Sequence, residues 1–192
     1  MEATAARDGR SVRAERTRDA VVDALLELLD EGDVRPTAER IAERAGVSER
    51  SVFQHFGDRE ALFEAAAQRQ YERIVPTLRP VDPALPLAER IDEFTAQRAR
   101  LYEKVSGVRR GAILIEHESA TVADRLQRVR RAKVREVEKV FAAELAGRDQ
   151  AVRDALTAAC AWTSWQSLRF HQGLSAARAR EAMRAAIRGL LG

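Results

Sequence analysis

Residues 37–56 read TAERIAERAGVSERSVFQHF, and this stretch decides the fold. Thr37 can cap a short helix whose apolar stripe stops at Gly46, and Ser48 can cap a second short helix. Gly46 supplies the left-handed residue of the turn, and Val47 fills the space between the two helices. The stretch therefore predicts a helix-turn-helix motif.

The second helix of this motif has one apolar side and one polar side. Val52 and Phe56 are four residues apart, so both side chains face inward. The side chains that must then point outward are all polar: Glu49, Arg50, Ser51, Gln54 and His55. Because such groups can bond to base edges and phosphates, this helix is predicted to read DNA.

The chain before the motif predicts one helix and a tail. Apolar residues recur at helical spacing up to Gly32, namely Val21, Val22, Leu25, Leu26, Leu28 and Leu29. Residues 1–16 are rich in Ala and Arg without apolar periodicity, which predicts a disordered arm. Arg13, Arg16 and Arg18 either contact the minor groove or phosphates or remain in solvent.

After the motif, Asp58 and Glu60 begin a linking helix that is predicted over 58–78. Four prolines then crowd one short stretch, at 76, 80, 83 and 86, and proline disfavours helix in the residue before it. We therefore predict a DNA-binding domain at 17–78 and a C-terminal domain at 79–192. Helical segments are predicted at 87–105, 107–118, 121–146, 150–172 and 175–191, and no strand pattern occurs, so the fold class is all-α.

Net charge gives no argument for nucleic-acid binding. Residues 1–78 contain 12 Arg, no Lys and 16 acidic residues, a net charge of −4, although the whole chain carries +3. Affinity for phosphate must then come from a few placed arginines and from backbone amides. No apolar run is long enough to cross a membrane and no leader segment occurs, so a soluble, cytoplasmic protein is expected.

With these motifs in hand, the sequence resembles the tetracycline-repressor (TetR) family. The resemblance covers about Val21 to Ala66 and rests on AERAGVS at 42–48, VFQHF at 52–56 and DREAL at 58–62. It implies an N-terminal helix-turn-helix domain and a larger helical domain for ligand binding and dimerisation. The function implied is that of a dimeric repressor that leaves a palindromic operator when a small molecule of unknown identity binds.

The resemblance also implies roles for single residues. Thr37, Ser51, His55 and Arg59 resemble phosphate contacts, whereas Glu49 and Arg50 take the variable positions that face bases. Phe53 stands where the family usually has tyrosine, so a hydroxyl bond to phosphate is lost there, although the ring can still pack on sugar or a thymine methyl. The full set of expected DNA contacts is Thr37, Arg44, Ser48, Glu49, Arg50, Ser51, Phe53, Gln54, His55 and Arg59.

Two further sets are expected in the C-terminal half. Residues 151–165 are apolar nearly all round, so a second chain is the expected cover, as in the dimer-forming helix pair of the family. The expected interface residues are Ala155, Ala159, Trp162, Trp165, Ala179, Met183 and Ile187. The candidates for a ligand pocket are Tyr102, Ile113, Glu116, His117, Trp162 and Trp165, and core packing or solvation is the alternative for the tryptophans and His117.

Two other classes of function remain open. A constitutive DNA-binding dimer without ligand control would fit if the C-terminal core were filled by side chains. An enzyme would need a catalytic set such as Cys160 with His117 or His171, and no supporting motif accompanies these residues. We therefore predict no catalytic residue, no cofactor and no metal site.

Overall fold

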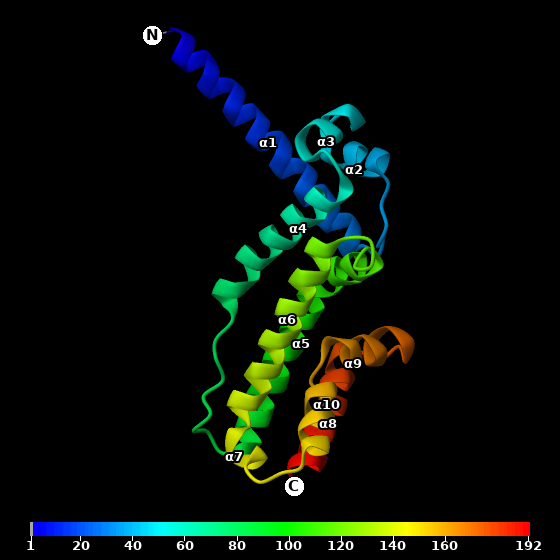
Figure 1. Cartoon of the computed structure of the whole chain (residues 1–192). Coiled ribbons are helices and arrows are strands. Elements are labelled where there is room, and N and C mark those ends of the chain that lie inside the picture. Colours follow the sequence, from blue (N-terminus) through cyan, green and yellow to red (C-terminus); the bar gives the residue numbers. More distant parts are fainter. Residues whose placement is uncertain (1) are drawn as a thin grey trace. The chain divides into compact units, whose positions relative to one another are not determined.

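The regular secondary structure of the described part of the chain is all helical (Figure 1). The computed structural model describes residues 2–192, with side chains from Ser11 onward, and these residues form no β-strand, which confirms the all-α prediction. The elements are α1 (Glu2–Asp30), α2 (Ala38–Ala45), α3 (Glu49–Phe56), α4 (Arg59–Ile74), the 3-10 helix η1 (Val75–Thr77), α5 (Leu87–Leu114), α6 (Ala120–Val140), α7 (Ala142–Leu145), α8 (Gln150–Ala159), α9 (Trp162–Gln166), the π-helix η2 (Ser167–His171) and α10 (Ala176–Leu191).

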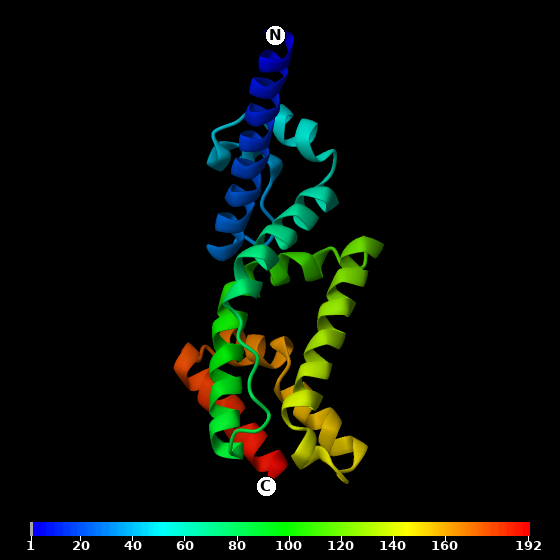
Figure 2. The ribbon, with the colours of Figure 1, turned by 90° about the vertical axis from the view of Figure 1, so that its left-hand side faces the viewer.

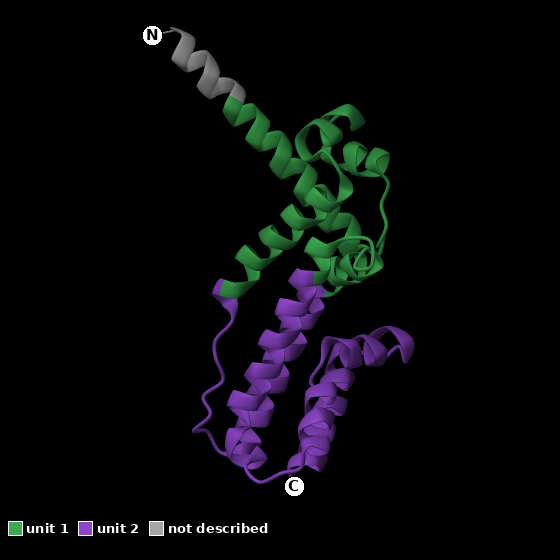
Figure 3. Ribbon diagram, viewed as in Figure 1, with its two compact units in different colours: residues 1–75, 106–123 green, residues 76–105, 124–192 purple. Residues whose placement is uncertain are grey.

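The chain divides into two compact units (Figure 3). Unit 1 contains residues 1–75 and 106–123, and unit 2 contains residues 76–105 and 124–192. The first break lies three residues before the predicted boundary at 78. Residues 106–123, which the sequence assigned to the C-terminal domain, instead cluster with unit 1.

The core of unit 1 is built on α1, which packs against α2, α3 and α4 (Figure 2). The predicted apolar stripe of α1 is buried along its whole length, from Val21 to Leu29. Ile41 of α2, Val52 and Phe56 of α3, and Phe63 of α4 complete this core with few polar groups. The four helices therefore bury their apolar faces on one another.

The start of α1 differs from the predicted disordered arm. Side chains from Ser11 to Arg16 belong to α1 and are exposed. Ala, Arg and Glu have high helix propensity, and a helix that is already packed over 17–30 extends at little cost. The remainder of the predicted arm lies outside the residues whose side chains are described.

Two glycines of α5 explain why residues 106–123 join unit 1. A Cβ on Gly107 would lie 2.8 Å from the carbonyl oxygen of Leu29 and 2.6 Å from a carboxylate oxygen of Asp30. A Cβ on Gly111 would lie 2.8 Å from side-chain atoms of both Leu29 and Phe63. Since the two glycines are one helical turn apart, they open a strip of α5 backbone against the end of α1. The helix also continues through Ser106, where the sequence predicted a break.

Unit 2 contains α8 and α10 packed side by side. The single helix predicted over 150–172 is interrupted at Cys160, after which α9 and η2 follow. No proline or glycine causes this break. The Tyr102 hydroxyl donates to the Cys160 carbonyl at 2.7 Å, and the Ser164 hydroxyl donates to the Ala158 carbonyl at 2.6 Å. These hydroxyls satisfy carbonyl groups that an unbroken helix would pair internally.

Candidate nucleic-acid interface

Side-chain caps fix both helices of the predicted motif. The Thr37 hydroxyl accepts a hydrogen bond from the backbone N–H of Arg40 at 3.3 Å, and the Ser48 hydroxyl accepts one from Ser51 at 3.2 Å. Gly46 adopts φ +67°, the left-handed conformation that the sequence predicted for the turn. Thr37 and Ser48 therefore begin α2 and α3, and their hydroxyls serve the fold whatever they bind outside it.

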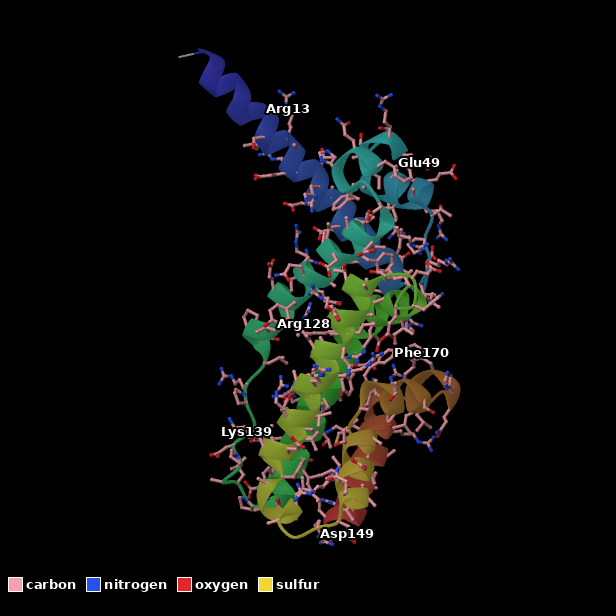
Figure 4. The ribbon with its side chains drawn as sticks, in the orientation of Figure 1. Arg13, Glu49, Arg128, Lys139, Asp149 and Phe170 are labelled. Atoms are coloured by element: carbon pink, nitrogen blue, oxygen red, sulfur yellow. The ribbon has the colours of Figure 1, made fainter. Side chains whose placement is uncertain are left out.

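The faces of α3 lie as predicted. Val52 and Phe56 are buried, whereas Glu49, Arg50 and Gln54 are exposed. Figure 4 labels Glu49 at the surface of this helix. The Phe53 ring is 52% exposed, which is unusual for a large apolar side chain and leaves it open to a partner. Of the other polar positions predicted to face outward, Ser51 and His55 are half-buried.

Arg18 supports the end of α3 from α1. Its Nη1 donates to the His55 carbonyl at 2.8 Å, and its guanidinium carbon lies 4.3 Å from the centroid of the Phe56 ring. A cation bonded to a carbonyl in the last turn also complements the helix dipole. The sequence grouped Arg18 with the arm, whereas the structure gives it a positioning contact to the reading helix.

Arg44 and Arg40 are engaged within unit 1. Arg44 makes two bonds to the Glu31 carboxylate, at 2.8 and 2.9 Å, and a longer one to Glu27 at 3.4 Å. The hydrogen bond from Arg44 lowers the pKa of Glu31 below its ordinary value. Arg40 pairs with Asp33 at 2.6 Å. Each cation has a carboxylate partner in the chain, and the contact of Arg44 with a phosphate stays a prediction.

Arg59 opens α4 one residue after its cap, Asp58, whose carboxylate accepts from the backbone N–H of Ala61 at 2.8 Å. The Arg59 guanidinium lies 5.4 Å from the Phe63 ring centroid, and the residue is exposed. Partial desolvation, followed by the nearby charge of Arg35, lowers its pKa, although arginine stays cationic at neutral pH. A cation at a helix start is a suitable phosphate contact, because free backbone amides lie beside it.

The residues expected to line a pocket fall into both units. Tyr102, Trp162 and Trp165 are buried in unit 2, and the Tyr102 and Trp165 ring centroids are 6.2 Å apart. Ile113, Glu116 and His117 belong to unit 1. The His117 side chain is 75% exposed, and its place in a ligand pocket stays a prediction. The His117 imidazole lies shortly after the end of α5 and is exposed to solvent.

Most of the expected dimer residues are covered within their own chain. Five of them have 2% of their surface exposed or less: Trp162, Trp165, Ala179, Met183 and Ile187. They form the contact of α8, α9 and α10 inside unit 2, so little of their surface remains for a partner, and which residues face a second chain stays a prediction. Ala155 is exposed and Ala159 is half-buried. The apolar spacing in the sequence predicted that these five positions are buried, but it does not indicate whether the same chain or a second chain covers them.

The residues that could suggest catalysis differ in their surroundings. Cys160 is buried in unit 2, whereas His117 belongs to unit 1 and His171 is exposed. Burial raises the pKa of the Cys160 thiol to about 12, so it stays protonated at neutral pH and is a poor nucleophile. Among the described residues, no cluster of three metal-binding side chains occurs and no helix is long and apolar enough to cross a membrane.

Comparison with known proteins agrees with this geometry. Residues 21–66 match the sequence profile of the bacterial regulatory proteins of the tetR family. A transcriptional regulator from Rhodococcus sp. Rha1 has a similar structure, with a TM-score of 0.65 at 16% identity over 93% of this chain and 95% of that chain. A TetR-like transcriptional regulator from Rhodococcus sp. RHA1 gives 0.62 at 21% identity over 95% and 97%. No curated protein sequence matches the chain.

The structural likeness establishes the fold, and the profile match falls on the helices α1 to α4 that carry the capped motif and its exposed polar face. On these grounds residues 21–66 are similar to the DNA-binding region of tetR-family regulatory proteins, and the chain has the fold of the TetR-like regulators that it resembles.

Proposed function

We propose that this protein is a homodimeric repressor that binds a palindromic operator through α3 and leaves it when a small molecule binds. One observation supports the proposed recognition of DNA by α3. Val52 and Phe56 anchor this helix in the core, and Glu49, Arg50 and Gln54 are exposed on its other side. A rigid helix with exposed bonding groups on one face suits the major groove. Release from the operator by a ligand is proposed because TetR-family repressors are usually regulated in this way.

Exposed small residues support dimerisation through α8 and α10. On α8, Ala151, Ala155 and Ala158 are exposed, and on α10 the exposed residues include Ala185, Ala186 and Gly189. Such residues allow close approach of helices from a second chain, and pairing two helices from each chain gives a four-helix interface with a two-fold axis. A two-fold axis in the protein matches a palindrome in DNA.

We infer separate roles for Arg50 and Arg59. Arg50 lies in the first turn of α3 and is expected to bond to a base edge, whereas Arg59 is expected to bond to a phosphate. Arg50→Ala should therefore weaken operator binding by roughly 1–3 kcal/mol and leave binding to a random duplex nearly unchanged. Arg59→Ala should weaken both alike and should make the plot of log affinity against log salt shallower by about two for the dimer.

The measurement is a salt titration by fluorescence anisotropy on an operator and on a random duplex of equal length. Arg73→Ala is the matched control, because Arg73 is exposed on α4 but pairs with Asp23 at 2.7 Å. It should leave both affinities nearly unchanged. A loss confined to the operator for Arg59→Ala would remove it from the phosphate contacts, and an equal loss on both duplexes for Arg50→Ala would remove it from the base contacts.

A constitutive DNA-binding dimer is the second candidate. It is favoured by the tight packing of Trp162, Trp165 and Met183 inside unit 2, each with 2% exposure or less. The two candidates differ in whether any small molecule lowers operator affinity. Unit 2 also contains a buried cation, which favours the regulated form.

A further inference from the structure

One arginine of unit 2 is entirely buried. Arg98 of α5 has no exposed side-chain surface, although arginine is among the residues least often buried. Its guanidinium carbon lies 4.5 Å from the Phe94 ring centroid and 5.8 Å from the Tyr102 ring centroid. These aromatic residues precede and follow it by four positions, so all three share one side of α5. The cation is thus fixed between two aromatic rings.

The hydrogen bonds of Arg98 are long and incomplete. Its Nη1 donates to Oε2 of Glu136 at 3.2 Å, and its Nη2 donates to the Lys133 carbonyl at 3.4 Å. Its Nε has no hydrogen-bond partner. The Nε–Nη2 edge, which binds a planar carboxylate by two parallel bonds, therefore has only one long contact.

Arg90 on the same helix is a buried arginine whose terminal nitrogens have strong hydrogen-bond partners. It is 4% exposed, and its Nε also lacks a partner. Its terminal nitrogens, however, bond to the Pro83 carbonyl at 2.8 Å and closely to Glu144. The difference lies in these terminal bonds. A buried cation costs several kcal/mol unless it is well paired, so the weak pairing of Arg98 calls for an explanation.

The weak partner of Arg98 is already bound to another group. Oε2 of Glu136 accepts from the Lys133 ammonium at 2.8 Å, which is shorter than its contact with Arg98. The Glu136 side chain is 27% exposed, so its carboxylate lies near solvent as well as near Arg98. Glu136 bonds to Nη1 and not to the Nε–Nη2 edge, so a second carboxylate on that edge displaces only the long contact with the Lys133 carbonyl.

We propose that Arg98 recognises the carboxylate of an amphipathic organic acid, and that this acid is the effector. The inference rests on the proposed regulation by a small molecule and adds the chemical class of the ligand. The carboxylate forms two bonds with the Nε–Nη2 edge of Arg98. The apolar part of the acid packs on the surrounding aromatic groups of unit 2, which include Phe94, Tyr102 and Trp165.

The test measures binding of acids and their neutral amides to the full-length protein by titration calorimetry. The probes are octanoate and 3-phenylpropionate, each compared with its primary amide. The acids should bind saturably and the amides should bind far more weakly. Arg98→Met keeps the aliphatic bulk but removes the charge, and it should weaken acid binding by about 10- to 100-fold. Arg90→Met is the control and should leave acid affinity unchanged.

A second variant changes affinity in the opposite direction. Glu136→Gln removes the negative charge beside Arg98 that repels an incoming carboxylate, so acid binding should tighten several-fold. This variant keeps the test decisive even if Arg98→Met does not fold, because Glu136 is partly exposed and its amide is nearly isosteric. A purely structural ion pair would give no tighter binding on loss of Glu136.

Three results would overturn the inference: equal binding of amides and acids, unchanged or weaker acid binding by Glu136→Gln, or no acid binding by the folded wild type at millimolar concentration. Release of operator DNA is measured in the same titrations, so that failure of the Arg98 site can be distinguished from failure of the proposed regulation. Acids that bind through Arg98 without releasing DNA support the site and contradict the regulation. A neutral compound that releases DNA equally from wild type and Arg98→Met supports the regulation and contradicts the site.

Discussion

Met183→Asp is expected to unfold unit 2. The Met183 side chain is 1% exposed on the inner side of α10. Loss of a buried methionine side chain costs about 2–5 kcal/mol, and a buried carboxylate without a partner adds several more. Since a domain of this size is stable by only about 5–15 kcal/mol in total, the variant should lose its cooperative transition. Circular dichroism during thermal and urea unfolding measures this.

Ala186→Asp is the matched control for the same helix. Ala186 lies three residues after Met183 and is exposed, so the same substitution should change unfolding by no more than about 0.5 kcal/mol within one chain. If α10 faces a second chain, this control should instead weaken the dimer in light scattering. A well-folded Met183→Asp variant that is only monomeric would show that Met183 faces the partner, contrary to the burial described above.

Gly107→Ala is expected to destabilise unit 1 by roughly 1–3 kcal/mol, the usual cost of overpacking. The new Cβ would meet the Leu29 carbonyl oxygen at 2.8 Å, and backbone yields less readily than a side chain. Alanine has a helix propensity better than glycine by about 1 kcal/mol. A net loss of stability would therefore show that the clash of the new Cβ with the backbone outweighs the gain in helix propensity. The measurement is the midpoint of urea unfolding, converted to a free energy.

Gly111→Ala serves as the comparison, because its new Cβ would meet two side-chain atoms, of Leu29 and Phe63, as its nearest neighbours. Those side chains can rotate, so its cost should be smaller than that of Gly107→Ala. A Gly107→Ala variant as stable as the wild type would contradict the packing of α5 on α1.

Much of unit 1 could be predicted from the sequence because its signals are local. Thr37, Ser48 and Asp58 cap their helices through their own side chains, and Gly46 adopts the left-handed conformation that its place in the motif requires. The apolar stripe of α1 is buried as its spacing indicated. Each of these features depends on residues within one helical turn of each other.

The features that sequence analysis missed depend on distant residues. The break at Cys160 is stabilised by Tyr102, which lies 58 residues earlier. The ion pair of Arg44 was also not predicted, because its partner Glu31 lies 13 residues earlier, in the turn after α1. The placement of 106–123 in unit 1 had a signal, since Gly107 and Gly111 are one turn apart, and a glycine pair at that spacing indicates a close crossing. Nothing local indicated the buried state of Arg98.

The central claim is that a dimer reads DNA sequence through two copies of α3. The most direct measurement is selection of binding sites by the wild-type protein from a pool of random duplexes. We predict enrichment of an inverted repeat whose half-sites are about one helical turn or a multiple of it apart, since that spacing places two recognition helices on one side of the DNA. Enrichment of a single half-site, or of no sequence at all, would contradict the account.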